Sequence, residues 1–158
     1  MLKSVKVRDH MLRKPVLVHP DTDLFEAMHL ILVNKISGVT VVDNRHRPVG
    51  ILSELDCLRM LSSDEFYAGQ QEEEGLVKDF MTNPGLTIPP EMGIYAIAHY
   101  FLTKPVRRLP VVREGRLLGQ VSRRDVLKAV EEMGQKRQPN RKQYPDYRLP
   151  SSEVGARR

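Results

Sequence analysis

Several features that mark secreted proteins and membrane proteins are missing from this 158-residue chain. It has a single cysteine, Cys57, so no internal disulfide can form, and a buried small side chain in a reducing compartment is the simplest interpretation. No apolar run reaches the roughly 18 residues that a membrane-spanning helix requires. Residues 1–6 lack the apolar segment of a secretory signal. We therefore expect a cytoplasmic protein that does not enter the membrane.

Sequence patterns of catalysis are missing as well. The chain contains no Gly-x-x-x-x-Gly-Lys-Ser/Thr phosphate loop and no Ser, His and Asp in the order of a nucleophile-elbow enzyme. No Cys and His residues follow the spacing of a zinc site. We predict that the chain is not an enzyme, holds no metal and requires no cofactor.

The net charge of +5 comes from the C-terminal end of the chain. Residues 134–158 hold seven Lys or Arg and two Asp or Glu, which leaves 18 of each sign in residues 1–133. Three prolines and few apolar residues predict that the basic tail at 131–158 is flexible. Such a tail could contact nucleic acid or another acidic partner, although a solvated tail that aids solubility is the simpler interpretation.

Two stretches of the chain are versions of one another. Val7-Arg8-Asp9-His10-Met11 returns 70 residues later as Val77-Lys78-Asp79-Phe80-Met81, and the same shift places Val41-Val42 on Val111-Val112. After a one-residue deletion in a turn, residues 50–56 match residues 119–125. A repeat of this size is a supersecondary unit that packs against its copy. Any polar group that the unit carries should therefore appear twice, in two related clefts.

Each repeat changes its hydrophobic period in the order β-α-β-β-α. In repeat 1 the predicted elements are a strand at 16–18, a helix at 23–34, strands at 38–42 and 49–52, and a helix at 53–61. In repeat 2 they are a strand at 86–88, a helix at 92–103, strands at 109–112 and 117–121, and a helix at 123–132. Neither half can cover its own sheet, so we predict one intertwined α+β domain. Repeat 1 at 5–61 and repeat 2 at 75–130 pack about a pseudo-twofold axis and are joined by an acidic linker at 62–74.

The repeated pattern resembles the cystathionine β-synthase (CBS) domain, which occurs in tandem as the Bateman module. The resemblance rests on the opening Val-x-Asp-x-Met, on residues 36–43 with their counterpart at 106–112, and on two Gly-x-x-Ser-x-x-Asp endings. It covers about residues 5–61 and 75–130. Repeat 1 departs from the family at Thr40, where the family usually has the proline seen at Pro110.

The resemblance implies a ligand sensor and not a catalyst. Members of the family hold adenine nucleotides such as AMP, ADP or ATP in clefts between the repeats, and S-adenosylmethionine or a cyclic dinucleotide is less expected. The hydroxyl of each ending typically meets the phosphates and the aspartate takes the ribose hydroxyls, which assigns these roles to Ser53 and Asp56 and to Ser122 and Asp125. Free backbone N–H groups at the helix start would add to the phosphate site. The residues expected around the base are Leu17, Val18, Thr87, Ile88 and Pro110.

The two expected clefts differ in their basic residues. Repeat 2 carries Arg108 and Arg123 where repeat 1 carries Gly38 and Glu54. A guanidinium binds phosphate through two parallel hydrogen bonds, whereas a glutamate repels it. We therefore expect the cleft of the second Ser-x-x-Asp to be the better nucleotide site. Ser-x-x-Asp is also a helix-capping pattern, and on spacing alone the arginines could face solvent.

Two functions remain open at this point. The first is a regulatory module that senses an adenine nucleotide and signals to an unknown effector protein on another chain. The alternative is a docking protein with vestigial clefts, whose basic tail contacts nucleic acid or an acidic partner. In either case the helices carry more apolar surface than so small a core can hide, which predicts a homodimer. The residues behind this prediction are Leu58, Met60, Leu61, Met92, Ile94, Tyr95 and Phe101.

Overall fold

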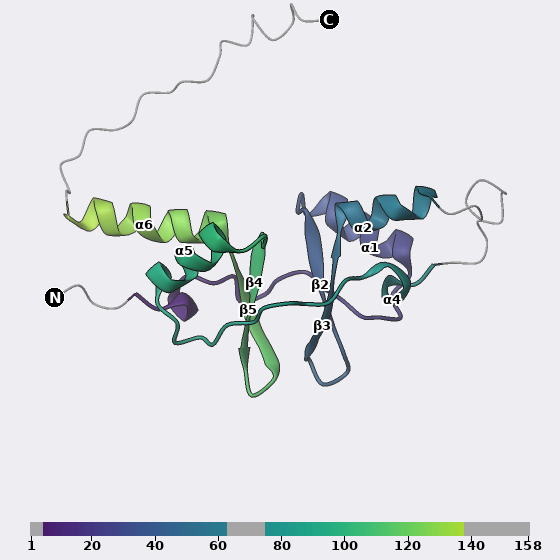
Figure 1. The fold of residues 1–158 in the computed structure, drawn as a ribbon, viewed down its shortest axis with the longest axis horizontal. Helices are drawn as coiled ribbons and strands as arrows, with labels where there is room; N and C mark the ends of the chain where they lie inside the picture. Colours follow the sequence, from purple (N-terminus) through teal and green to yellow (C-terminus); the bar gives the residue numbers. More distant parts are fainter. Residues whose placement is uncertain (1–4, 63–74, 138–158) are drawn as a thin grey trace, which may run out of the picture.

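The computed structural model describes residues 5–62 and 75–137. Figure 1 shows two halves side by side, each with a small sheet and helices at one end, and both hairpins extending in the same direction. Mixed helix and strand content in two related units confirms the predicted α+β fold. Most of the acidic linker and the part of the basic tail beyond Arg137 lie outside the described residues.

The half that contains most of repeat 1 follows the predicted order of elements. Its sheet has the order β1-β2-β3, with β1 parallel and β3 antiparallel to β2. Helix α1 begins where predicted because the carboxylate of Asp23 accepts a hydrogen bond from the Glu26 backbone N–H at 3.1 Å. The elements are β1 (Leu17–Val18), α1 (Leu24–Val33), β2 (Gly38–Val42), β3 (Pro48–Ser53), α2 (Glu54–Leu58) and the 3₁₀ helix η2 (Arg59–Ser62).

The half that contains most of repeat 2 has a reduced first strand and a longer last helix. In place of a strand at 86–88, one parallel bridge joins Ile88 to Val111. Helix α6 continues to Arg137, beyond the predicted end at Glu132. The elements are α4 (Val77–Phe80), α5 (Ile94–Thr103), the antiparallel pair β4 (Arg108–Arg113) and β5 (Arg116–Ser122), and α6 (Arg123–Arg137).

The two repeats exchange their opening segments. The 3₁₀ helix η1 (Val7–Asp9) lies against repeat 2, because the Val7 N–H donates to the Met92 carbonyl at 2.9 Å. Helix α4 lies against repeat 1 in the same way, through the Val77 N–H and the Thr22 carbonyl at 2.9 Å. Val7 is fully buried in the core of repeat 2 and Val77 in the core of repeat 1. This exchange confirms the predicted intertwined domain.

After the exchanged helices, each chain segment crosses back over a strand of the other repeat (Figure 1). Leu12 exchanges two backbone hydrogen bonds with Gln120, at 2.8 and 3.0 Å. This contact requires a glycine beside it, since a Cβ on Gly119 would lie 2.5 Å from the Leu12 carbonyl oxygen. Thr82 pairs with Ile51 in the same way on the other side of the axis. The crossing segments therefore run beside the ends of β3 and β5, where the two Ser-x-x-Asp motifs lie.

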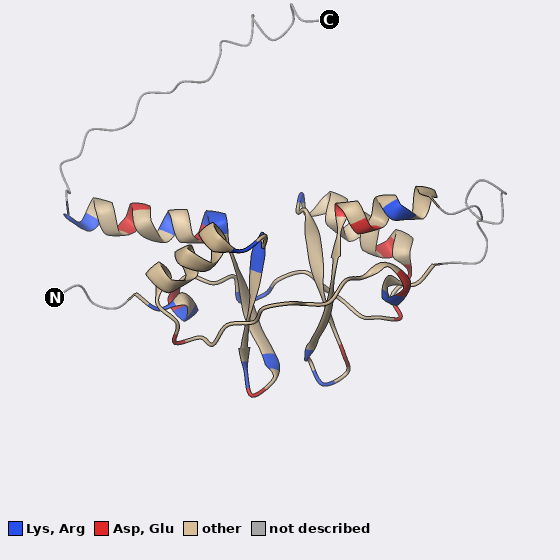
Figure 2. Ribbon diagram, in the orientation of Figure 1, with Lys and Arg blue, Asp and Glu red and all other residues tan. Residues whose placement is uncertain are grey.

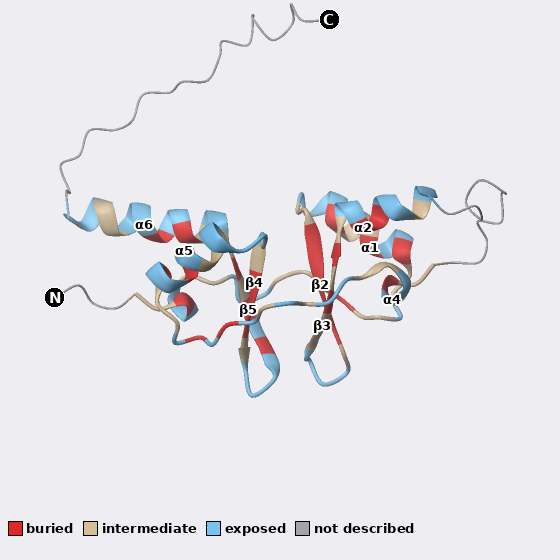
Figure 3. Cartoon of the chain, in the orientation of Figure 1, coloured by how far each residue is buried: buried red, intermediate tan, exposed pale blue. Residues whose placement is uncertain are grey.

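Figure 3 shows buried residues along the strands and on the inner faces of the helices. They form two cores of similar size, one in each half. The outer faces of α1, α2, α5 and α6 expose leucines, among them Leu102 at 85% exposure. Of the residues predicted to give apolar surface, Leu58, Leu61 and Tyr95 are exposed, whereas Ile94 is buried because it points into the repeat 2 core.

Candidate functional site

The best candidate site is a cavity of about 370 Å³ between the two repeats. One wall is the end of β3 and the start of α2, from repeat 1. The other wall comes from repeat 2, through the crossing segment 82–85 and the start of β4. Its lining residues are Ser37, Ile51, Ser53, Glu54, Leu55, Thr82, Asn83, Pro84, Gly85, Pro105, Val106, Arg107 and Arg108.

The cavity lining combines apolar side chains with polar and charged ones, and both repeats contribute to each kind. Three hydroxyl side chains, those of Ser37, Ser53 and Thr82, and three charged side chains form much of the polar lining. Figure 2 shows basic residues where β4 begins and acidic residues where α2 begins, on the facing ends of the two halves. The apolar residues of the lining are Ile51, Leu55, Pro84, Pro105 and Val106. Such a combination suits a ligand with a flat apolar part and an anionic part.

Arg108 reaches from repeat 2 across the pseudo-twofold axis. Its guanidinium donates to the hydroxyl of Ser37 and fills the space above Gly38, where an added Cβ would clash with Nη1. Burial lowers the pKa of Arg108, as does the nearby charge of Arg107, while the carboxylate of Glu54 raises it. An arginine stays protonated in a protein, so Arg108 is a half-buried cation with few charged neighbours.

The position of Arg108 corrects the expected grouping of the site residues. From the sequence, Arg108 was expected to act with Ser122 and Asp125, because all three belong to repeat 2. The structure instead places it in the cavity with Ser53. The physical reason is that repeat 1 has a glycine at the twofold-related position, Gly38, and the long arginine side chain extends into the space that the glycine leaves.

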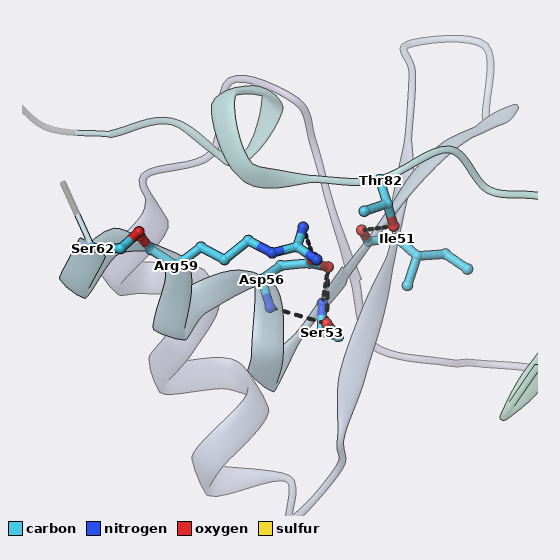
Figure 4. Close-up of polar contacts among 6 residues, drawn as sticks. All are labelled: Ile51, Ser53, Asp56, Arg59, Ser62 and Thr82. Atoms are coloured by element: carbon cyan, nitrogen blue, oxygen red, sulfur yellow. Dashed lines mark hydrogen bonds and ion pairs between the residues drawn. The ribbon is translucent and has the colours of Figure 1, made fainter.

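Ser53 and Asp56 form a complete capping box at the start of α2 (Figure 4). Asp56 Oδ2 accepts from the Ser53 N–H and hydroxyl, both at 2.9 Å, and the Asp56 N–H donates to Ser53 Oγ at 3.1 Å. Arg59 binds the other carboxylate oxygen at 3.0 Å. The Glu54 N–H is also occupied, by the Ser37 carbonyl at 3.0 Å. The expectation of free N–H groups for phosphate is therefore wrong for these three donors, and the capping interpretation is confirmed.

Ser122 and Asp125 repeat this capping geometry at the start of α6. Asp125 Oδ2 accepts from the Ser122 N–H at 2.8 Å and from its hydroxyl at 2.9 Å. Within the described residues, no hydrogen bond or ion pair engages the second oxygen, Oδ1. Arg123 is exposed and donates to the Val106 carbonyl at 3.3 Å. Asp125 lines a smaller cavity of about 290 Å³ together with Asp9, His10, Met11, Leu12, Lys128 and Glu132.

The residues expected around the base are dispersed. Val18, Ile88 and Pro110 are buried within the two halves, and Thr87 is exposed. Leu17 lines a separate cavity of about 320 Å³ near the hairpins. These positions were expected to face a ligand because the resemblance implies a base between the short first strand and the central strand. The apolar lining of the main cavity instead comes from residues outside the expected set: Ile51, Leu55, Pro84, Pro105 and Val106.

Other features of the described residues add no second chemistry. Across residues 5–62 and 75–137, no three His, Cys, Asp or Glu side chains are grouped so as to hold a metal ion. Cys57 is buried, and burial, followed by the charges of Asp56 and Glu54, raises the pKa of its thiol. In the same part of the chain, no helix is both long and apolar enough to cross a bilayer.

Comparison with curated proteins places both repeats in a family. The model of the CBS domain matches residues 7–63 and 77–132. The chain is 32% identical over 128 residues to an inosine-5'-monophosphate dehydrogenase of Aquifex aeolicus, and the match covers 80% of this chain but only 24% of that enzyme. It is 29% identical over 148 residues to an uncharacterized protein of Methanocaldococcus jannaschii, covering 76% of this chain and 88% of that protein.

Solved structures share the fold. The CBS-pair protein CBSX2 from Arabidopsis thaliana is 28% identical with a TM-score of 0.72, and the match covers 84% of this chain and 99% of that one. A second structure of CBSX2, in complex with AMP, is 27% identical with a TM-score of 0.72 and covers 82% and 98% of the two chains. With both repeats matched by the domain model and the pair fold shared, this chain belongs to the CBS domain family.

Proposed function

We propose that the chain is a regulatory module that binds an adenine nucleotide in the cavity of Ser53 and Arg108 and signals its occupancy to another protein. The observation that carries the proposal is the pairing of Arg107 and Arg108 with an apolar lining in one cavity of about 370 Å³. That volume lies near the lower end of the roughly 300–1,000 Å³ typical of small-molecule sites. The AMP complex of CBSX2 supports the ligand class.

Each part of the cavity fits one part of a nucleotide. The base lies against Ile51, Pro84 and Val106, which offer apolar surface on opposite walls. The phosphate lies against Arg107 and Arg108, because a guanidinium matches phosphate oxygens in a bidentate way. The same two arginines disfavour S-adenosylmethionine, whose sulfonium and ammonium groups are positive, so the charges favour a phosphate-bearing ligand over that alternative.

The second cleft, around Ser122 and Asp125, is proposed as a weaker site. The unpartnered oxygen of Asp125 is available to a ribose hydroxyl. Arg123 could contribute to a phosphate only by leaving the Val106 carbonyl. A nucleotide there would be held by fewer fixed cations than in the cavity of Arg108.

The composition of the cavity supports the proposed regulatory role. Its walls come from both repeats, so a ligand that contacts both walls favours one relative arrangement of the halves. In the Aquifex aeolicus dehydrogenase the matching region is about a quarter of the protein, which supports a module that accompanies other activities. We accordingly propose that the chain acts on an effector protein, is not itself an enzyme, and works in the cytoplasm.

Calorimetry on the full chain tests the proposal. AMP, ADP, ATP, S-adenosylmethionine and a cyclic dinucleotide are titrated in turn under the same buffer conditions. We expect saturable binding of at least one adenine nucleotide and weaker binding of S-adenosylmethionine. If none of the five binds at millimolar concentration, the regulatory proposal fails. In that case salt-sensitive binding of a nucleic acid would favour the docking alternative through the basic tail.

We also propose that the chain forms a homodimer through its helices. Equivalent leucines are exposed in both repeats, Leu32 with Leu102 on α1 and α5, and Leu58 with Leu127 on α2 and α6. A surface with this internal symmetry can pair with a copy of itself about a twofold axis. Light scattering should give twice the chain mass of 18.1 kDa, and Leu102→Glu should reduce it to the monomer. A monomeric mass for the wild type at micromolar concentration contradicts the proposal.

A further inference from the structure

We infer that the cavity of Ser53 and Arg108 selects a nucleoside monophosphate, and that Glu54 is the residue that excludes longer phosphate chains. This inference rests on the proposed function and adds to it the class of nucleotide. Glu54 lines the same cavity as Arg107 and Arg108. Its carboxylate therefore shares the cavity with any phosphate bound to the arginines, and it would repel the second and third phosphates of ADP or ATP.

The cations of the cavity suffice for one phosphate. Among the described residues that line it, Arg107 and Arg108 are the positive side chains and Glu54 is the negative one. Glu54 is near enough to act on the charge of Arg108. A phosphate monoester carries up to about two negative charges at pH 7, which the two guanidinium groups can balance. Every further phosphate adds negative charge that no additional lining cation balances and that Glu54 repels.

Backbone donors do not replace the missing cations. Sites for polyphosphates commonly use several free N–H groups at a helix start or in a nest. At the start of α2, the Ser53 and Asp56 N–H groups are engaged in the capping box and the Glu54 N–H bonds to the Ser37 carbonyl. Binding a triphosphate there would require breaking these bonds. The cavity can therefore hold one phosphate at the arginines without rearranging α2.

The fold does not require an acidic residue at the position of Glu54. At the position equivalent to Glu54, repeat 2 has Arg123, and both begin a helix directly after a capping serine. The fold therefore tolerates either charge at this position. Since Glu54 is exposed and its side chain makes no hydrogen bond or ion pair within the described residues, changing it should leave folding intact.

The experiment compares AMP, ADP and ATP by calorimetry, with a chelator present so that the phosphate chains keep their full charge. The variants are Glu54→Gln, Glu54→Arg and the control Glu131→Gln, which removes the same charge from an exposed position on α6 outside the described cavities. We expect the wild type and the control to bind AMP about tenfold more tightly than ATP. Glu54→Gln should reduce this preference to about threefold or less, and Glu54→Arg should reverse it.

Two outcomes separate this inference from the proposed function. If the wild type binds AMP and ATP equally, or if the ratio of their affinities is unchanged in both Glu54 variants, the assignment of Glu54 is overturned while nucleotide binding stands. If neither nucleotide binds the wild type, the proposed function fails and the inference fails with it. A change of the ratio in Glu131→Gln of the same size as in Glu54→Gln would show a general charge effect and would also overturn the assignment.

Discussion

The two Ser-x-x-Asp motifs have the same local geometry but different surroundings. Asp56 is 3% exposed, and both its oxygens are engaged, one by the cap and one by Arg59. Asp125 is half-buried, and Lys128, at the position equivalent to Arg59, forms no ion pair with it within the described residues. The same motif thus gives a carboxylate with both oxygens engaged in repeat 1 and a carboxylate with one oxygen still free to accept a hydrogen bond in repeat 2, within the described residues.

A second difference lies at the twofold axis itself. Gly38 of repeat 1 and Arg108 of repeat 2 occupy equivalent positions and meet across the axis. Only one of the two positions can carry a long side chain, since the other must provide the space for it. Thr40 and Pro110 differ in a related way, because the buried hydroxyl of Thr40 bonds the side-chain oxygen of Gln120 from the other repeat at 3.4 Å. The repeats have therefore diverged as a complementary pair.

The largest expected effect comes from removing this complementarity with Gly38→Ala. The new Cβ would lie 2.7 Å from the Leu52 carbonyl oxygen, a backbone atom that cannot rotate away, and would also displace Arg108. We expect a loss of about 2–3 kcal/mol of unfolding free energy, or a fall of roughly 5–10 °C in thermal midpoint for a chain of this size. Gly93→Ala is the control, because its Cβ would have no neighbour closer than 3.9 Å. Equal midpoints for the two variants would contradict the account of the axis.

The next prediction compares the arginines of the two clefts. Arg108→Met should weaken AMP binding by about ten- to a hundredfold, the loss of roughly 1.5–3 kcal/mol for a hydrogen-bonded charge. Arg123→Met should change it less than about threefold, because Arg123 is exposed and is not among the residues that line the main cavity. Calorimetry on both variants measures the difference. A larger loss of AMP affinity in Arg123→Met than in Arg108→Met would place the nucleotide in the cleft of Ser122, as the sequence alone predicted.

Several features of the fold could be predicted from the sequence. The repeat and the order of elements follow from periodicity and from the 70-residue shift, and the structure confirms them except at 86–88, where a single bridge replaces the predicted strand. Local patterns suffice for the individual elements because each depends on neighbours along the chain. The capping boxes at Ser53 and Ser122 are local in the same sense, and their spacing indicated them. The intertwined halves were expected on a different ground, that neither repeat can cover its own sheet, and the exchange of Val7 and Val77 confirms them.

The composition of the candidate site could not be read in the same way. A count of arginines by repeat assigned Arg108 to the motif of its own repeat, whereas its side chain lies in the cavity of the other. The apolar lining includes Pro84 and Val106, which no local pattern marks as facing a ligand. Each error has its own cause. Arg108 crosses the axis because Gly38 leaves space for it, and the crossing of residues 82–85 over β3 depends on contacts between segments about 30 residues apart, such as Thr82 with Ile51.

A smaller effect should separate the two aspartates in stability. Asp56→Ala removes the charged acceptor of the capping box and the ion pair with Arg59, and leaves the Ser53 N–H without its partner. We expect a cost of about 2 kcal/mol for Asp56→Ala and about 1 kcal/mol for Asp125→Ala, whose carboxylate is less buried and lacks the ion pair. Urea unfolding of both variants measures this difference. A larger loss for Asp125→Ala would show that the extra contact of Asp56 adds no stability.

The smallest expected effect concerns Cys57 and its repeat 2 equivalent, Val126, both buried in corresponding places of the two cores. Cys57→Val places the side chain found at the equivalent position of repeat 2, and it should change the free energy of unfolding by less than about 1 kcal/mol at pH 7. The two proteins should differ more at alkaline pH. Burial, and then the charge of Asp56, raises the pKa of the thiol in the folded chain. Above the ordinary thiol pKa of about 8.5, the unfolded chain releases a proton that the folded chain keeps, so rising pH favours unfolding. Urea midpoints between pH 7 and pH 10 should therefore fall further for the wild type than for Cys57→Val, and parallel curves would show that the thiol stays at its ordinary pKa.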